Sequence, residues 1–325
     1  MIENDLNTVV YPPNKSLQRK IELSKTPVVY EHLLFLEFND KDESILGCAN
    51  LNGTLWEGTL LFFSNEENLL LLKHNRSLVG STVSDGKFLN DSTFALAEDT
   101  GLLNILTISR ENQTIQSAGY YREVDRIPKI AVWKNSSRIL TCSNKAVTIW
   151  DINSTIRKPL HHFPDYHTEL INYVDTLRSE PNVFVTASMD RKCCIWDDRN
   201  PCPASVLYNN EFCSLTSVAC NQHNTNYVVV GSEGGDIYLL DKREPKDFIS
   251  VASCNCYIYR LAFDDSNKLA VCGDINKVLV FKCEDEILNS AYCNDKHSGI
   301  VRGLAWNKET LYSCGFDKQV VKHLF

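Results

Sequence analysis

The sequence lacks long apolar runs, basic runs and the signals that direct a chain to a membrane. No stretch approaches the roughly 18 apolar residues that cross a bilayer, and residues 1–11 have neither the basic nor the apolar part of a secretory signal. The net charge is −8, and no block of about five or six basic residues could follow a phosphate backbone. We therefore predict a cytoplasmic, or also nuclear, protein without membrane partners and without direct binding of nucleic acid.

Enzyme and metal motifs are also missing. There is no phosphate-binding GxxxxGK[ST] loop, no GxSxG nucleophile turn and no HExxH zinc motif. The 13 cysteines form no CxxC pair, and most lie in strand-like runs, as is typical of small buried side chains in a reducing compartment. We predict no metal, no cofactor and no catalytic residue. Paired carboxylates, such as Glu66–Glu67 and Asp197–Asp198, fall in predicted turns, and an enzyme built on such acids is a minor alternative.

What the sequence does contain is a repeat. Short β-branched and aromatic runs, separated by Asn, Asp, Gly and Ser, occur along the whole chain, and no long helical period competes with them. Aligning these runs gives equivalent positions that are 41 to 46 residues apart: Phe63, Leu106, Trp150, Trp196, Leu240, Phe281 and His323. This spacing matches the period of about 40–45 residues of a four-stranded propeller blade.

Two of the seven positions carry a literal Trp-Asp pair, at residues 150–151 and 196–197, which resembles the WD40 repeat. We predict an all-β chain: a flexible segment over residues 1–16 and a seven-bladed WD40 β-propeller over residues 17–325. The last repeat ends at Phe325 without an outermost strand. A strand from within Leu17–Tyr30 is therefore predicted to join the last blade, because closing the ring removes an exposed sheet edge.

The fourth repeat has the fullest set of polar residues. His167 precedes its first strand, Ser188 and Asp190 stand at a turn, and Trp196 follows. A structural network that fixes the blade is the favoured interpretation, since buried polar atoms need partners. A catalytic His-Asp-Ser group is the less favoured alternative. The last repeat contains a partial copy of the network, His297 with Asp317.

The segment of residues 51–58 in the first repeat is rich in turn-forming residues and places Trp56 beside glycines. An exposed tryptophan is a good candidate for an interface hot spot, because it fills a partner pocket or stacks on an arginine. Packing between blades is the alternative for Trp56.

Four segments resemble one family, the WD-repeat adaptor of the methylosome: Ile45–Gly58, Ser188–Ser205, Val230–Lys242 and Gly315–Leu324. The Trp-Asp-x-Arg run that is followed by Pro-Ala-Ser, and the closing Gln-Val-Val-x-His, are more specific than the repeat itself. Asn144 departs from the pattern, because a turn Asp is usual there. The chain resembles a divergent member, such as the insect form of the family.

The resemblance implies a non-catalytic scaffold that binds the protein arginine methyltransferase that makes symmetric dimethylarginine. It also implies help in recruiting the basic tails of histones and Sm proteins and, for the insect form, a germline role with Tudor-type partners. By the same resemblance Trp56 contacts the methyltransferase, with Leu51, Asn52 and Leu55 beside it. A substrate receptor of a ubiquitin ligase, or a chromatin scaffold, is the alternative, since Trp196–Arg199 resembles a short motif of ligase receptors.

Overall fold

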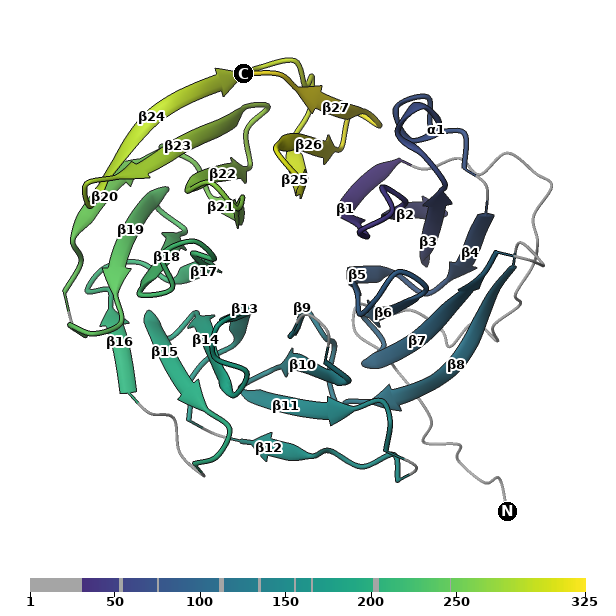
Figure 1. The fold of residues 1–325 in the computed structure, drawn as a ribbon, viewed down its shortest axis with the longest axis horizontal. Coiled ribbons are helices and arrows are strands. Elements are labelled where there is room, and N and C mark those ends of the chain that lie inside the picture. Colours follow the sequence, from purple (N-terminus) through teal and green to yellow (C-terminus); the bar gives the residue numbers. More distant parts are fainter. Residues whose placement is uncertain are drawn as a thin grey trace.

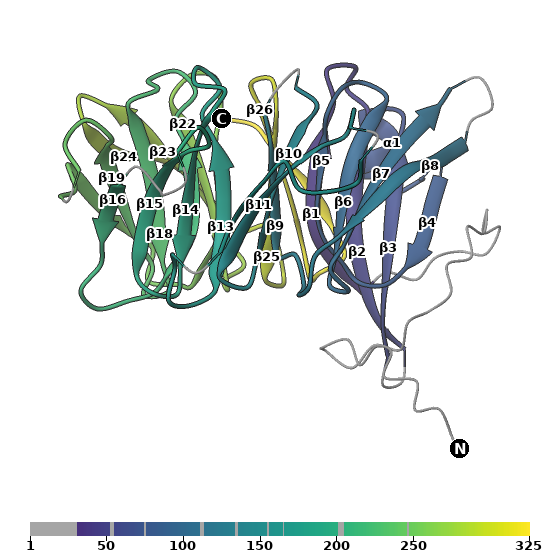
Figure 2. The ribbon, with the colours of Figure 1, turned by 90° about the horizontal axis from the view of Figure 1, so that it is seen from below.

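The computed structural model describes nine stretches of the chain, namely residues 31–52, 55–74, 76–110, 114–133, 136–154, 156–164, 166–200, 205–245 and 247–325. These stretches form antiparallel sheets that stand in a ring, seven in number within the described part (Figure 1). Seen from the side, the ring is a short cylinder (Figure 2). The predicted all-β, seven-bladed propeller is confirmed.

Each blade is written here from its innermost to its outermost strand. Blade 1 is β1 (His32–Phe38), β2 (Ser44–Asn52), β3 (Leu55–Phe63) and β4 (Arg76–Gly80); blade 2 is β5 (Val83–Phe88), β6 (Thr93–Glu98), β7 (Leu102–Ser109) and β8 (Thr114–Arg122). Blade 3 is β9 (Lys129–Val132), β10 (Arg138–Ser143), β11 (Ala146–Asp151) and β12 (His161–Phe163); blade 4 is β13 (Ile171–Thr176), β14 (Val183–Ser188), β15 (Lys192–Asp197) and β16 (Ser205–Asn209). Blade 5 is β17 (Leu215–Cys220), β18 (Tyr227–Ser232), β19 (Asp236–Asp241) and β20 (Ser250–Ser253); blade 6 is β21 (Ile258–Phe263), β22 (Lys268–Gly273), β23 (Val278–Glu284) and β24 (Ile287–Asn294). Blade 7 is β25 (Val301–Asn307), β26 (Thr310–Gly315) and β27 (Val320–His323).

The seven repeat positions of the sequence all fall on the third strand of a blade, from Phe63 on β3 to His323 on β27. Their cross-strand partners show the same register. Trp150 pairs with Ile139, and Trp196 pairs with Phe184. The regular spacing in the sequence therefore reflects one structural position repeated around the ring.

The core lies between neighbouring blades rather than within one of them. One cluster joins Trp133 of blade 3 to Phe184 and Trp196 of blade 4, and all three side chains are buried. Because both faces of a sheet are covered in this way, the second strands are almost continuously apolar, and all six residues of β14 are buried. Each blade depends on its neighbours for its stability.

Blade 7 has three strands within the described residues. The predicted closing strand within Leu17–Tyr30 and the predicted flexible segment over residues 1–16 both lie outside the described part of the chain. A short helix, α1 (Glu66–Leu70), covers part of the junction between blade 7 and blade 1. Leu69 packs there with Tyr312 and Val320. The prediction of a turn at Glu66–Glu67 was wrong, since Asn65 caps a helix at this point by accepting from the backbone N–H of Asn68.

Candidate functional site

The candidate docking surface is the end of the long hairpin formed by β2 and β3. This end extends beyond the neighbouring loops of the ring (Figure 2). Trp56 lies on regular strand, not in the loop that its neighbouring glycines predicted, and its side chain is half-buried. Leu51 pairs directly across the hairpin with Trp56 and is 46% exposed. Because directly paired residues share one face of a sheet, these two apolar side chains lie side by side.

Two further aromatic rings lie beneath this hairpin. The ring centroids of Trp56 and His32 are 5.8 Å apart, and those of His32 and Phe316 are 4.6 Å apart. Phe316 belongs to the turn that follows β26 in blade 7, so the row of rings connects the first blade to the last. We name Leu51, Trp56, His32 and Phe316 the Trp56 surface.

The other two residues predicted for this surface are Asn52 and Leu55. Their backbones pair with each other at the end of the hairpin. Their side chains lie outside the described part of the chain. The docking role of all four predicted residues stays a prediction.

The polar residues predicted in blade 4 lie in one network, except that Thr186 takes the place predicted for Ser188. Nδ1 of His167 is 2.8 Å from Oδ2 of Asp190, and Nε2 of His167 is 2.8 Å from the hydroxyl of Thr186. Trp196 donates its indole N–H to the same hydroxyl at 2.9 Å. Ser188, which the sequence placed in the network, donates to the carbonyl of residue 170 at 2.9 Å and accepts the N–H of Asp190 at 3.1 Å. Ser188 therefore holds the turn, and Thr186 links the histidine to the tryptophan.

The directions of these hydrogen bonds follow from two groups, since the indole of Trp196 can only donate and the carboxylate of Asp190 can only accept. Nδ1–H of His167 therefore donates to Asp190, and in this tautomer Nε2 accepts the proton of the Thr186 hydroxyl. The same hydroxyl accepts from Trp196. His167 is 1% exposed and both of its ring nitrogens have partners. This arrangement braces a blade around a buried histidine.

Blade 7 repeats the network with a second histidine in place of the tryptophan. His297 lies 2.8 Å from Asp317 and 2.7 Å from the hydroxyl of Ser313. That hydroxyl is 2.7 Å from Nε2 of His323, whose Nδ1 is 3.3 Å from the hydroxyl of Tyr292. Burial lowers the pKa of His323 to about 4, and repulsion from His297 adds to this effect. His323 is therefore neutral at pH 7.

Blade 3 shows a third version of the same network. Trp150 donates to the hydroxyl of Thr141 at 3.0 Å, and Thr141 donates to the carboxylate of Glu123 at 2.6 Å. Sequence reasoning missed Thr141, Glu123, Thr186 and Ser313, and it missed the polar roles of Trp150 and His323. A detectable signal was present: a Ser or Thr stands nine or ten residues before the repeat position in all three blades.

Metal and membrane features were searched within the described stretches only. There, no group of three or more His, Cys, Asp or Glu side chains is arranged to hold a metal ion. No helix in those stretches is long and apolar enough to cross a membrane.

Comparison with known proteins agrees with the geometry of the blades. The family described as WD domain, G-beta repeat matches residues 157–197, which include β12 of blade 3 and β13 to β15 of blade 4. The chain is a seven-bladed propeller that contains a WD40 repeat. A chain in the solved structure titled "Crystal Structure of Mitotic Checkpoint Complex" has a TM-score of 0.73 to this propeller and 13% identity, covering 95% of this chain and 94% of that chain. At this identity the likeness shows the fold alone.

Three curated proteins are similar to this propeller in sequence. Methylosome protein WDR77 of Xenopus laevis is 21% identical over 296 residues, which are 86% of this chain and 85% of that protein. The E3 ubiquitin-protein ligase COP1 of Arabidopsis thaliana is 27% identical over 54% of this chain and 25% of its own length. Human protein NEDD1 is 23% identical over 78% of this chain and 40% of its own length. The methylosome protein is the one of these three that matches at nearly full length on both sides.

Proposed function

We propose that this WD40 propeller is a non-catalytic adaptor that binds a protein arginine methyltransferase of the methylosome type. The observation that carries the proposal is the similarity to a methylosome protein over 86% of this chain and 85% of that protein. We also propose that the chain helps to recruit basic substrates, namely the tails of histones and Sm proteins. Its net charge of −8 attracts basic segments. A cytoplasmic location, with the nucleus as a second one, belongs to this proposal.

The Trp56 surface is the proposed contact with the methyltransferase. It combines a half-buried tryptophan with an exposed leucine on a projecting hairpin. Interface hot spots are enriched in tryptophan, which fills well-packed pockets of the partner. The ring of His32, which packs in turn on Phe316, lies against Trp56.

The test is binding of the purified chain to a methylosome-type arginine methyltransferase, measured by surface plasmon resonance. We expect wild type to bind and Trp56→Ala to weaken binding at least about tenfold, the effect typical of a hot spot. Phe212→Ala is the matched control, because Phe212 is an 85% exposed aromatic in the loop between blades 4 and 5. No binding by wild type contradicts the function. Equal binding by wild type and Trp56→Ala contradicts only the assignment of the surface.

A substrate receptor of a ubiquitin ligase is the second candidate. COP1, named as an E3 ubiquitin-protein ligase, is similar to about half of this chain, and this similarity favours the second candidate. Mass spectrometry of proteins that copurify with the chain separates the two candidates, since one predicts a methyltransferase and the other a ligase subunit. The methylosome relative is a frog protein. The insect form, Valois, and its Tudor-type germline partners stay predictions that no comparison supports.

A further inference from the structure

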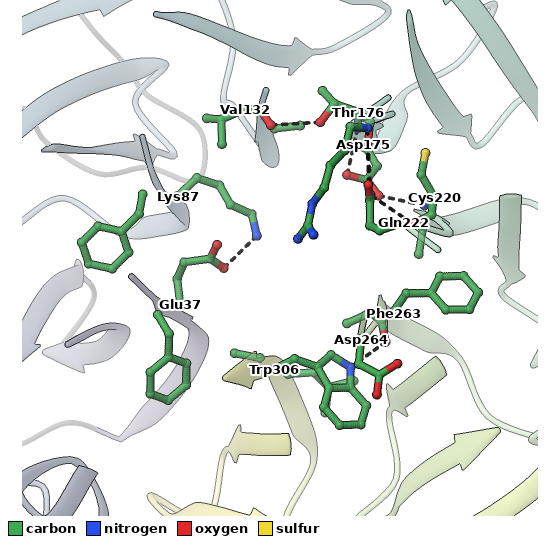
Figure 3. A pocket seen from close by; sticks show the side chains of 18 of the residues that line it. Glu37, Lys87, Val132, Asp175, Thr176, Cys220, Gln222, Phe263, Asp264 and Trp306 are labelled. Atoms are coloured by element: carbon green, nitrogen blue, oxygen red, sulfur yellow. Dashed lines mark hydrogen bonds and ion pairs between the residues drawn. The ribbon is translucent and has the colours of Figure 1, made fainter. Parts of the chain in front are cut away.

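A cavity of about 540 Å³ lies at the axis of the propeller, on the opposite face from Trp56. The ends of the innermost strands and the loops that follow them form its wall. Figure 3 shows Glu37, Lys87, Asp175 and Trp306 around this space, each from a different blade. The cavity is therefore shared by the whole ring and belongs to no single repeat.

Most charged groups on the wall of this cavity have partners. Lys87 donates to Glu37 at 2.7 Å. The carboxylate of Asp175 accepts two backbone N–H groups, at 2.8 and 2.9 Å. Arg178 donates to Asp265 at 2.8 Å, near solvent. These charged groups are already paired within the protein, so none of them requires the charge of a ligand.

Arg260 differs from the other charged residues of the wall. It lines the cavity, yet its side chain is 4% exposed. Its Nη1 atom is 3.6 Å from Oδ1 of Asp85 across the channel. Within the described part of the chain, neither of these two buried atoms has a hydrogen-bond partner. A guanidinium with open donors is thus buried at the wall of a cavity.

The surroundings of Asp85 contain more positive than negative charge. Lys129 is 3.5 Å from the same oxygen of Asp85, and Arg302 stacks at 3.9 Å on the ring of Tyr259 nearby. Burial lowers the pKa of Lys129 to about 8; Asp85 opposes this shift, and repulsion from Arg260 and Arg302 adds to it. Two buried cations, Arg260 and Lys129, therefore share the carboxylate of Asp85, and buried charge that lacks a counter-charge is unfavourable.

We propose that this cavity binds a small oxyanion, a phosphate or a carboxylate group, against the guanidinium of Arg260. Such an anion accepts the open N–H donors and supplies the missing negative charge. Arginine suits the role because its planar fork matches the oxygens of phosphate and carboxylate. The site is separate from the Trp56 surface, on the opposite face of the ring.

The test uses the full chain, with sodium phosphate and sodium acetate as probes, in calorimetric titrations at low ionic strength. We expect millimolar or tighter binding of at least one anion. Arg260→Met should weaken it at least about tenfold, the loss that accompanies a charge-assisted hydrogen bond. Arg199→Met is the matched control, since Arg199 is exposed and pairs with Asp197. Tighter binding of phosphate points to a phosphorylated group as the natural ligand, and tighter binding of acetate points to a carboxylate.

Asp85→Asn provides a second variant, because Arg260→Met alone could fail to fold. It removes the carboxylate that competes for Arg260, so the anion should bind more tightly. Absence of binding of both anions to wild type overturns the proposal. Unchanged affinity in a folded Arg260→Met variant, or unchanged or weaker affinity in Asp85→Asn, overturns it as well.

Discussion

Replacing His323 by glutamine tests whether the network of blade 7 requires a neutral histidine. His323 is 2% exposed and lies between the hydroxyls of Ser313 and Tyr292. Glutamine offers an NH2 donor group and a carbonyl acceptor over a similar length, so it can serve both hydroxyls. It does not titrate. The variant therefore keeps the hydrogen bonds and removes the proton-binding group.

The expected effect is a change in how stability depends on pH. The pKa of His323 is about 4 in the folded chain, below its ordinary value of 6.5. The unfolded chain therefore binds the proton more tightly, and the folded state loses stability as pH falls from 6.5 towards 4. At pH 5, which is 1.5 pH units below the ordinary pKa of histidine, the free energy of unfolding falls by about 2 kcal/mol, because each pH unit contributes about 1.4 kcal/mol. At pH 7 it is close to zero.

Urea unfolding at pH 7 and pH 5 measures this effect. The wild type should lose about 2 kcal/mol more stability between the two pH values than His323→Gln does. Other titrating groups are shared by both proteins, so the difference isolates His323. His223→Gln changes an exposed histidine and should behave as wild type. Equal losses in wild type and His323→Gln would refute the placement of a neutral histidine in this network.

Two further predictions concern the stability of the blades. Thr186→Val removes the hydroxyl that joins His167 to Trp196 and leaves two buried polar atoms unpaired, so urea unfolding should show a loss of about 2–4 kcal/mol. Thr186→Ser should retain most of that stability, and an equal loss in both variants would count against the network. If the predicted closing strand lies beside β27, deleting residues 1–30 should expose that edge of the sheet. The melting temperature should then fall, and light scattering should rise because the exposed edges self-associate. An unchanged melting temperature would argue against that strand.

The blades could be predicted from the sequence because one structural position recurs. The third strand of every blade pairs with the second strand in the same register, so a buried side chain stands at this position, whether it is Trp150, Leu240 or His323. It was harder to predict from the sequence which hydroxyl of blade 4 bonds to the indole of Trp196. Thr186 and Ser188 point to the same face of β14, two residues and about 7 Å apart. Only the one nearer to Trp196 reaches its indole.

Glycine misled the interpretation of the hairpin around Trp56. Gly58 suggests a turn, yet it lies inside β3. Glycine is required there because a Cβ would collide with the carbonyl oxygen of Ser81. The glycine permits close packing and does not bend the chain. Likewise the approach of Arg260 to Asp85 depends on two strands far apart in the sequence that face each other across the ring. No local pattern predicts such a contact.

The position of the Trp56 surface has a consequence for the proposed adaptor. The surface joins blade 1 to blade 7, where the ring begins and ends, and the described part of blade 7 has three strands. Phe316, at one end of the row of rings, is followed directly by Asp317 of the blade 7 network. A partner bound across this junction would contact both ends of the ring. Since a ligand that binds only the folded state stabilises it, a methyltransferase bound there would also hold the propeller closed.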